Sequence, residues 1–323
     1  MTLHRTIAFA VTALVGLGAS VAGAEPANPI IGNWEGSFNT ADETSEATAK
    51  IIGWGDHYEL RLTVDEYTVS LNGERLGEMA AFRGIDGPEE EEHILTAEIL
   101  DGELTGRVAG PEISADFSLE RVFHRPDNLG AEPPEGAVVL FDGSDPSQWV
   151  RHPEQWSVVN GAMQVGGSNL RTREEFGDHR IHIEFRPAYM PNARGQGRGN
   201  SGVYVHGRYE VQVLDSFGED VDDSYCGGIY GLRAPDENVS LPPGEWQTYD
   251  ITFRAPRFDD DGEKIENARI TVVHNGTVIH DDFELPQATP GGLTTQEGEL
   301  GPIWLQDHGG DPVRFRNIWV ERL

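Results

Sequence analysis

The segment RYEVQVLDSFG (residues 208–218) carries the pattern that decides the fold. Successive side chains of a β-strand point to opposite faces, so Glu210 and Gln212 should share one face and Val211 and Val213 the other. The same alternation recurs in at least five more segments, at residues 58–64, 93–100, 180–187, 249–255 and 269–275. These runs are separated by glycine and proline, and no long amphipathic helix pattern interrupts them. The sequence therefore predicts an all-β protein.

The first 24 residues have the features of a secretory signal peptide. Arg5 precedes an apolar stretch at residues 7–17, and the small residues Ala22, Gly23 and Ala24 follow. The apolar stretch is too short to span a bilayer comfortably. We therefore expect cleavage after Ala24, export to the periplasm or the cell exterior, and no membrane insertion.

Charge and cysteine content exclude several kinds of protein. The formal net charge is −31, which repels nucleic acid and anionic membranes, so neither is an expected partner. The acidic run at residues 88–93 is expected to be a solvated loop, with a cation site as the alternative. The single cysteine, Cys226, excludes an internal disulfide and is expected to be a buried core residue rather than a reactive thiol.

The chain divides at a segment rich in proline and glycine. RPDNLGAEPPEG (residues 125–136) lacks a strand pattern and predicts a linker. Before it, residues 27–124 should form a small antiparallel β-barrel or sandwich of unknown role, with Asp101-Gly102 as a strong hairpin turn. After it, residues 137–323 have the length of a two-sheet β-sandwich.

Six segments of the second part occur in a specific order. They are AVVLFDGSDPSQW (137–149), WSVVNGAM (156–163), NSGVYVHGRYEVQVLDSFG (200–218), CGGIYG (226–231), PPGEWQTYDITFRAP (242–256) and GPIWLQDHGGDPVRFRNIWVERL (301–323). Together they closely resemble the 3-keto-disaccharide hydrolase family, over residues 136–323. The resemblance implies a concanavalin A-like jelly roll with a sugar-binding concave face, and exported bacterial enzymes that cleave glycosides already oxidised at C3. The family often has an arginine after the NSG segment, where this chain has His206. The chain departs from the family pattern at this position, in the region expected to bind substrate.

Two pairs of polar residues are the candidate reacting groups. Glu210 and Gln212 lie two apart, and Gln306 and His308 lie two apart in LQDHG, so each pair should share a strand face. In an oxidised sugar the C3 carbonyl acidifies the proton on C2, whose removal needs a base with a pKa near the working pH. We take Glu210 and His308 as the proton-transfer pair, without fixing which is the base. Gln212 and Gln306 would orient ring hydroxyls or the keto oxygen.

Asp215 leads to a comparison with ordinary jelly-roll glycosidases, whose catalytic strand reads Glu-x-Asp-x-(x)-Glu. Here the pattern is Glu210-x-Gln212-x-x-Asp215, and glutamine cannot exchange the proton that tunes a carboxylate pair. Asp215 would share the face of Glu210 only if a β-bulge intervened, in which case it would contact substrate. The alternatives to a 3-keto-glycoside hydrolase or lyase are therefore a conventional jelly-roll glycoside hydrolase and a non-catalytic carbohydrate-binding protein.

Further candidate substrate contacts come from a loop and an aromatic residue. Asn200 and Ser201 close the glycine-rich loop at residues 195–202 and would contact sugar hydroxyls, with turn formation as the alternative. Trp246 would stack on a sugar ring, with core packing as the alternative. Carboxylate, imidazole and amide groups could hold a divalent cation, but the sequence has no dense ligand motif, so no metal or other cofactor is assigned. The expected partner is an oxidised (3-keto) oligosaccharide or glycoside.

Overall fold

The computed structural model describes residues 28–323 except residues 78, 88–91 and 112. The expected signal peptide and most of the acidic run lie outside the described residues. The described part contains no α-helix, only the 3-10 turns η1 (Pro153–Gln155) and η2 (Gly195–Gly197), so no helix there could cross a membrane. The all-β prediction is confirmed.

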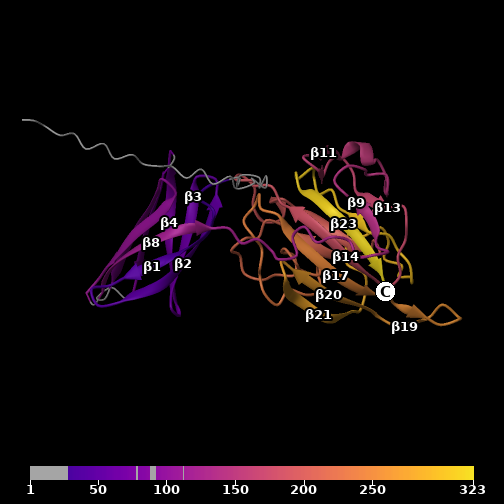
Figure 1. Ribbon diagram of the computed structural model, residues 1–323. Helices are drawn as coiled ribbons and strands as arrows, with labels where there is room; N and C mark the ends of the chain where they lie inside the picture. The colour runs from indigo at the N-terminus through magenta and orange to yellow at the C-terminus, as the bar shows by residue number, and fades with distance from the viewer. Residues whose placement is uncertain (1–27, 78, 88–91, 112) are drawn as a thin grey trace, which may run out of the picture.

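The first part of the chain is a closed barrel of eight antiparallel strands (Figure 1). The strands are β1 (Gly32–Asn39), β2 (Thr44–Trp54), β3 (His57–Val64), β4 (Tyr67–Leu76), β5 (Met79–Asp86), β6 (His93–Leu100), β7 (Glu103–Ala109) and β8 (Ser114–Val122). Each strand pairs with the next, and β8 pairs with β1. The expected turn joins β6 and β7, where Asp101 (φ 54°) and Gly102 (φ 84°) both take the left-handed backbone that tight hairpins need. Alternating side chains such as Trp34, Leu60 and Phe117 fill the interior, so the barrel is a packed core.

The second part is a sandwich of two antiparallel sheets (Figure 1). The smaller sheet has the order β10 (Trp149–Val150), β13 (Leu170–Thr172), β22 (Trp304–Leu305), β15 (Ser201–Val205), β16 (Tyr209–Val213). The larger sheet has the order β11 (Ser157–Val159), β12 (Ala162–Gln164), β23 (Arg314–Arg322), β14 (His179–Arg186), β17 (Gln247–Arg254), β20 (Ala268–His274), β21 (Thr277–Leu285), with β9 (Val138–Phe141) paired to β23. A separate hairpin joins β18 (Arg257–Phe258) and β19 (Lys264–Glu266). Apolar side chains from both sheets form one core between them.

The segment at residues 125–136 is held against the larger sheet. The Asn128 amide donates to Asp250 Oδ2 over 2.7 Å, and the Gly130 amide N–H donates to Glu184 Oε1 over 2.6 Å. Buried carboxylates need such donors because the charged form is otherwise poorly solvated. The predicted linker is thus a docked strap rather than a free tether.

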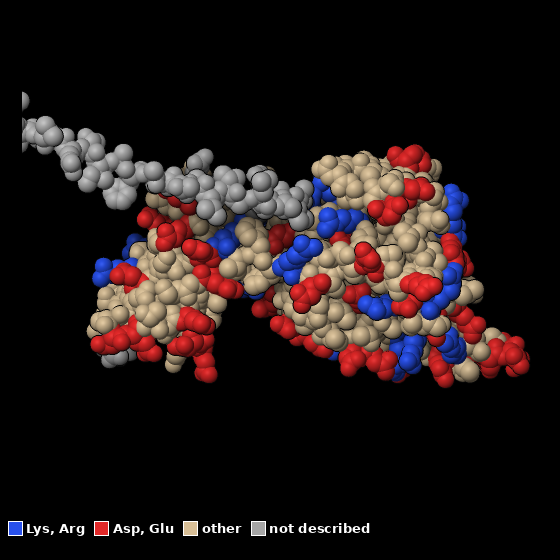
Figure 2. All heavy atoms as spheres, viewed as in Figure 1, with Lys and Arg blue, Asp and Glu red and all other residues tan. Residues whose placement is uncertain are grey.

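Negative charge is spread over both parts of the molecule. Figure 2 shows Asp and Glu side chains over the barrel and the sandwich alike on the face in view. The net charge of −31 is therefore distributed rather than confined to one tail. Such a surface gives no continuous positive footprint for a nucleic acid on this face.

Candidate active site

A cavity of about 180 Å³ opens on the side of the smaller sheet that faces away from the sandwich core. Its lining residues are Gln196, Asn200, Tyr204, Glu210, Gln212, Tyr230, Pro290, Gly291, Gln306 and His308. The β15–β16 register explains the grouping, because Tyr204 lies directly opposite Glu210. Alternation then turns Val211 and Val213 into the core while Glu210 and Gln212 face the cavity. The face predicted from the sequence pattern is the floor of this cavity.

Glu210 is the only carboxylate among the residues that line the cavity. It is 2 % exposed, and the Tyr204 hydroxyl donates to its Oε2 over 2.7 Å. Burial raises the pKa of Glu210 to about 8, against the lowering effect of the Tyr204 bond. The site therefore holds a carboxyl group that exchanges its proton near neutral pH.

Gly202 makes room for that carboxyl group. It lies opposite Gln212 on β15, and a Cβ placed on it would come within 2.1 Å of Glu210 Oε1. No real side chain tolerates such an approach, so any larger residue would displace the Glu210 carboxyl group. Glycine in this strand marks a close approach of a functional side chain to the backbone.

Two amide oxygens at the cavity lack protein partners. Asn200 Oδ1 and Gln306 Oε1 are buried without a hydrogen bond, although the Gln306 amide donates to the Tyr204 oxygen over 3.3 Å. Buried polar groups are almost always paired, so these two oxygens have room for a further hydrogen bond. Both oxygens could accept hydrogen bonds from sugar hydroxyls.

Gln212 lines the cavity but its polar atoms already have partners. Its amide donates to Gln196 Oε1 over 2.9 Å and to the Ser224 carbonyl over 3.2 Å, and its Oε1 accepts from the Val213 N–H. The Gln196 oxygen also accepts from the Asn200 amide over 3.0 Å. Gln212 thus fixes the loop that carries Gln196 and Asn200.

His308 lies at the exposed rim of the cavity. Strand β22 ends at Leu305, so Gln306 and His308 do not form the strand pair that was predicted. Both still line the cavity, because the chain after β22 stays beside β15, where the Gln306 N–H donates to the Gly202 carbonyl over 3.0 Å.

Asp215 is not brought into the cavity. Strand β16 ends at Val213, and the alternation ends with it, because Val213 and Leu214 both lie in the sandwich core. Asp215 is not among the residues that line the cavity. Its Oδ2 accepts from Arg198 Nη2 over 2.8 Å in a buried ion pair. Burial raises the pKa of Asp215 to about 6, against the lowering effect of Arg198. The bulge on which a substrate contact of Asp215 depended does not occur within the β15–β16 pairing, and Asp215 pairs with a cation outside the cavity lining.

Two other predicted contacts also lie elsewhere. Ser201 lies two residues before Val203 on β15 and so shares its face, which is turned to the sandwich core. The Ser201 hydroxyl donates to the Gln306 carbonyl over 2.6 Å. Trp246 stacks on guanidinium groups, with Arg316 at 4.0 Å and Arg186 at 5.0 Å from its ring centre. Neither side chain is among those that line the cavity. Local structure therefore describes Ser201 better than a substrate contact does, and side-chain packing describes Trp246 better.

The sequence reasoning missed Tyr204, Gln196, Tyr230 and Gly202. Tyr204 could have been found, because a two-residue period from Gly202 puts both on one face of the strand. Gln196 and Tyr230 come from loops, and their approach to the cavity depends on tertiary contacts. His206, near the family's arginine position, is buried against Phe253 with ring centres 4.5 Å apart and does not line the cavity.

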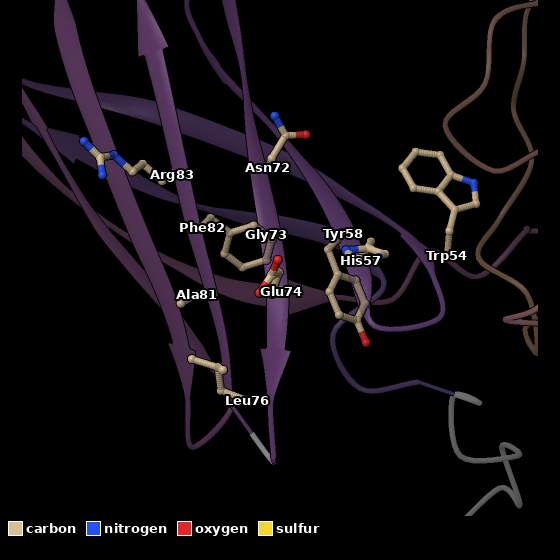
Figure 3. A pocket seen from close by; sticks show the side chains of 10 residues that line it. All are labelled: Trp54, His57, Tyr58, Asn72, Gly73, Glu74, Leu76, Ala81, Phe82 and Arg83. Carbon is tan, nitrogen blue, oxygen red and sulfur yellow. The ribbon is translucent and has the colours of Figure 1, made fainter.

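A larger hollow of about 540 Å³ lies on the barrel (Figure 3). Figure 3 shows its lining side chains along β3, β4 and β5, with Trp54 standing apart at the end of β2. None of its lining residues has a buried polar atom without a partner, in contrast to Asn200 and Gln306. The smaller cavity, which also holds the buried carboxyl group of Glu210, is therefore the candidate site. Nowhere in the described residues do three or more His, Cys, Asp and Glu side chains gather to hold a metal ion.

The sandwich matches a known family. A model of the 3-keto-alpha-glucoside-1,2-lyase-like domain matches residues 136–321. The chain belongs to this family. The cavity with Glu210 thus lies inside the region that defines the family, whereas the barrel lies outside it.

Two solved structures are similar to the sandwich, and the first of them agrees with this assignment. A candidate glycosyl hydrolase from Parabacteroides distasonis is 35% identical, with 58% of this chain and 84% of that chain covered and a TM-score of 0.53. A second candidate glycosyl hydrolase from the same organism is 22% identical, with 58% and 100% covered and a TM-score of 0.44. No curated protein matches the chain. The family and the first of these structures support a carbohydrate-active enzyme of the hydrolase type.

Proposed function

We propose that the protein cleaves the glycosidic bond of glycosides already oxidised at C3, by removal of the C2 proton and elimination. We further propose that it is exported and works in the periplasm or outside the cell. The observation that carries the first proposal is the Glu210 carboxyl group, which is buried, alone of its kind in the cavity and has a pKa of about 8. The family description, which names a 3-keto-alpha-glucoside-1,2-lyase-like domain, supports this choice of reaction.

Glu210 is the base in this proposal. Its carboxylate takes the C2 proton, and the electron pair of that C–H bond forms an enolate with the C3 carbonyl. A base is most effective when its pKa lies near the operating pH, which fits a value of about 8. The Gln306 amide has a second N–H beside the one that reaches Tyr204, and this N–H holds the enolate oxygen.

His308 is the acid. When the enolate collapses, the bond between C1 and the glycosidic oxygen breaks, and this oxygen takes a proton from the His308 imidazolium. The products are a 1,2-unsaturated 3-keto sugar and the free alcohol, with Glu210 protonated and His308 neutral. Both groups return to their starting forms by exchange with water. Addition of water across the new double bond would give the hydrolysed sugar.

The conventional glycosidase alternative lacks support in the cavity. Retaining enzymes need two carboxyl groups about 5–5.5 Å apart. Among the described residues lining the cavity Glu210 has no carboxylate partner, and Asp215 is committed to Arg198. A pure binding protein has no need of a carboxyl group whose burial costs stability, so that alternative is also weaker.

Product analysis on paired substrates tests the reaction. The purified chain is incubated with a C3-oxidised glucoside and with the same glucoside unoxidised, each with and without chelator, and the products are identified by mass spectrometry. We expect cleavage of the oxidised substrate alone. At early times the sugar product should be lighter by one water than the hydrolysed 3-keto sugar. Cleavage of the unoxidised glucoside would favour the conventional glycosidase, and binding without any product would favour the binding protein.

The roles of the two reacting groups are separated by variants and pH. Glu210→Gln should abolish turnover, and His308→Ala should lose less with substrates whose alcohol leaves easily. In the wild type the base and the acid must be in opposite protonation states, so the pH profile of kcat/KM should be bell-shaped. With Glu210 as base, kcat/KM of His308→Ala with an easily leaving alcohol rises with pH with a midpoint near 8, because only the ionised form of Glu210 takes the proton. A fall in rate across the same pH range would make Glu210 the acid. Turnover near the wild-type rate in both variants would remove the assignment.

A further inference from the structure

The barrel touches the segments that build one wall of the cavity. Gln196 and Asn200 line that wall, and both lie on the loop between β14 and β15. Arg194 Nη2 of this loop lies 3.4 Å from the carbonyl oxygen of Trp54, the last residue of barrel strand β2. Earlier in the same loop, the Tyr189 hydroxyl accepts from the Asn28 amide over 3.4 Å.

Arg198 is the centre of this contact. It lies between Gln196 and Asn200 in sequence and is 4 % exposed. Its Nη2 donates to Asp215 Oδ2 over 2.8 Å and reaches the Gly53 carbonyl of the barrel at 3.4 Å. Arg198 and Asp215 are also joined through the main chain, because the Asp215 N–H donates to the Arg198 carbonyl over 2.9 Å. One guanidinium thus joins the cavity loop, the end of β16 and the barrel.

The chain after Asp215 enters the barrel surface. Phe217 is 2 % exposed and belongs to the apolar cluster of the barrel, not to that of the sandwich. Gly218 follows, where a Cβ would come within 2.4 Å of Ile52, and its carbonyl accepts from Arg61 over 2.5 Å. The segment that partners Arg198 is therefore itself fixed on the barrel.

We propose that the barrel is a structural part of the sugar site, and that Arg198 is the positioning residue through which it fixes Gln196 and Asn200. This inference rests on the proposed function for its effect on catalysis, but not for its effect on the loop. Glu210 is held separately, by Tyr204 and β15, so loss of the Arg198 contact should weaken substrate binding more than the chemical step.

Two matched double variants of the full chain test the proposal. Arg198→Met with Asp215→Asn removes the ion pair without leaving a buried charge unpaired, which protects folding. Arg121→Met with Glu245→Gln removes another buried pair at the boundary of barrel and sandwich, joined over 3.4 Å and remote from the cavity lining. Arg198→Lys, which keeps a positive charge for Asp215, is the rescue variant.

Hydrogen exchange and steady-state kinetics are then measured on the same preparations. In the Arg198 double variant we expect amide exchange of residues 194–200 to rise about tenfold or more, and KM to rise about tenfold with a smaller fall in kcat. The Arg121 double variant should match the wild type in both, and Arg198→Lys should recover part of each effect.

Unchanged exchange at residues 194–200 in the Arg198 double variant would overturn the positioning role. An equal change in the Arg121 double variant would also overturn it, because any loosening of the boundary would then suffice. If the wild type does not act on 3-keto-glycosides, the proposed function fails, and the exchange data still decide whether the barrel fixes the loop.

Discussion

Glu210→Gln should make the protein more stable at neutral and alkaline pH although it removes the reacting group. The folded-state pKa of Glu210 is about 8, against an ordinary value of 4.5. Between these values the folded chain keeps a proton that the unfolded chain has lost, so the contribution of this group to stability falls as pH rises from about 4.5 to about 8. At one pKa unit per 1.36 kcal/mol, the full loss is about 5 kcal/mol, of which about 4 kcal/mol falls between pH 5 and pH 9.

Urea unfolding of the wild type and of Glu210→Gln at pH 5, 7 and 9 measures this difference. Glutamine does not titrate, so the stability gained by the variant should grow by about 4 kcal/mol from pH 5 to pH 9. Glu175→Gln is the matched control, since Glu175 is exposed on the sandwich, and it should follow the wild type. Parallel pH dependence of the wild type and Glu210→Gln would refute the raised pKa and the argument for Glu210 as base.

Three further outcomes follow from single contacts. Gly202→Ala should lower kcat/KM about 100-fold, because the new Cβ displaces the Glu210 carboxyl group. The control Gly177→Ala, whose Cβ would meet nothing closer than 3.6 Å, should keep the wild-type kcat/KM. Equal kcat/KM values in the two variants would contradict the steric argument. Tyr204→Phe removes the bond that lowers the pKa of Glu210, so in the His308→Ala background the rise in kcat/KM with pH should move up by about 1 pH unit. An unchanged midpoint would count against that bond. Cys226, 1 % exposed, should react with a thiol reagent only after unfolding in urea; rapid reaction of the native protein would disprove its burial.

Local patterns predicted the strands and the face of β16 because both depend on the two-residue period alone. The segment at residues 93–100 is β6 with the predicted bounds, and Asp101-Gly102 forms the predicted turn. Glu210 reaches the cavity for the same reason, since burial of Val211 and Val213 fixes the other face. Such features need no knowledge of the partner strand.

Hydrogen-bond partners that are distant in the sequence could not be predicted from local patterns. The strap at residues 125–136 has the composition of a linker, yet Asn128 and Gly130 satisfy carboxylates of β14 and β17 more than fifty residues away. Gln196 is held at the cavity because the Gln212 amide donates to its side-chain oxygen, and no spacing in the sequence indicates this bond. Proline and glycine content reports backbone preferences, and whether a segment is free or docked depends on what it meets.

The pattern Glu210-x-Gln212-x-x-Asp215 therefore divides into one proposed base and two residues that hold the cavity loop. Glu210 faces the cavity with its proton held near neutral pH, Gln212 binds the cavity loop through Gln196, and Asp215 binds the same loop through Arg198. A carboxylate in place of Gln212 would raise the pKa of Glu210 further by like-charge repulsion, and it could not donate to Gln196 as the Gln212 amide does. The glutamine between two acids thus suits a site with a single buried base, and the loop that it holds is the one that the barrel also touches.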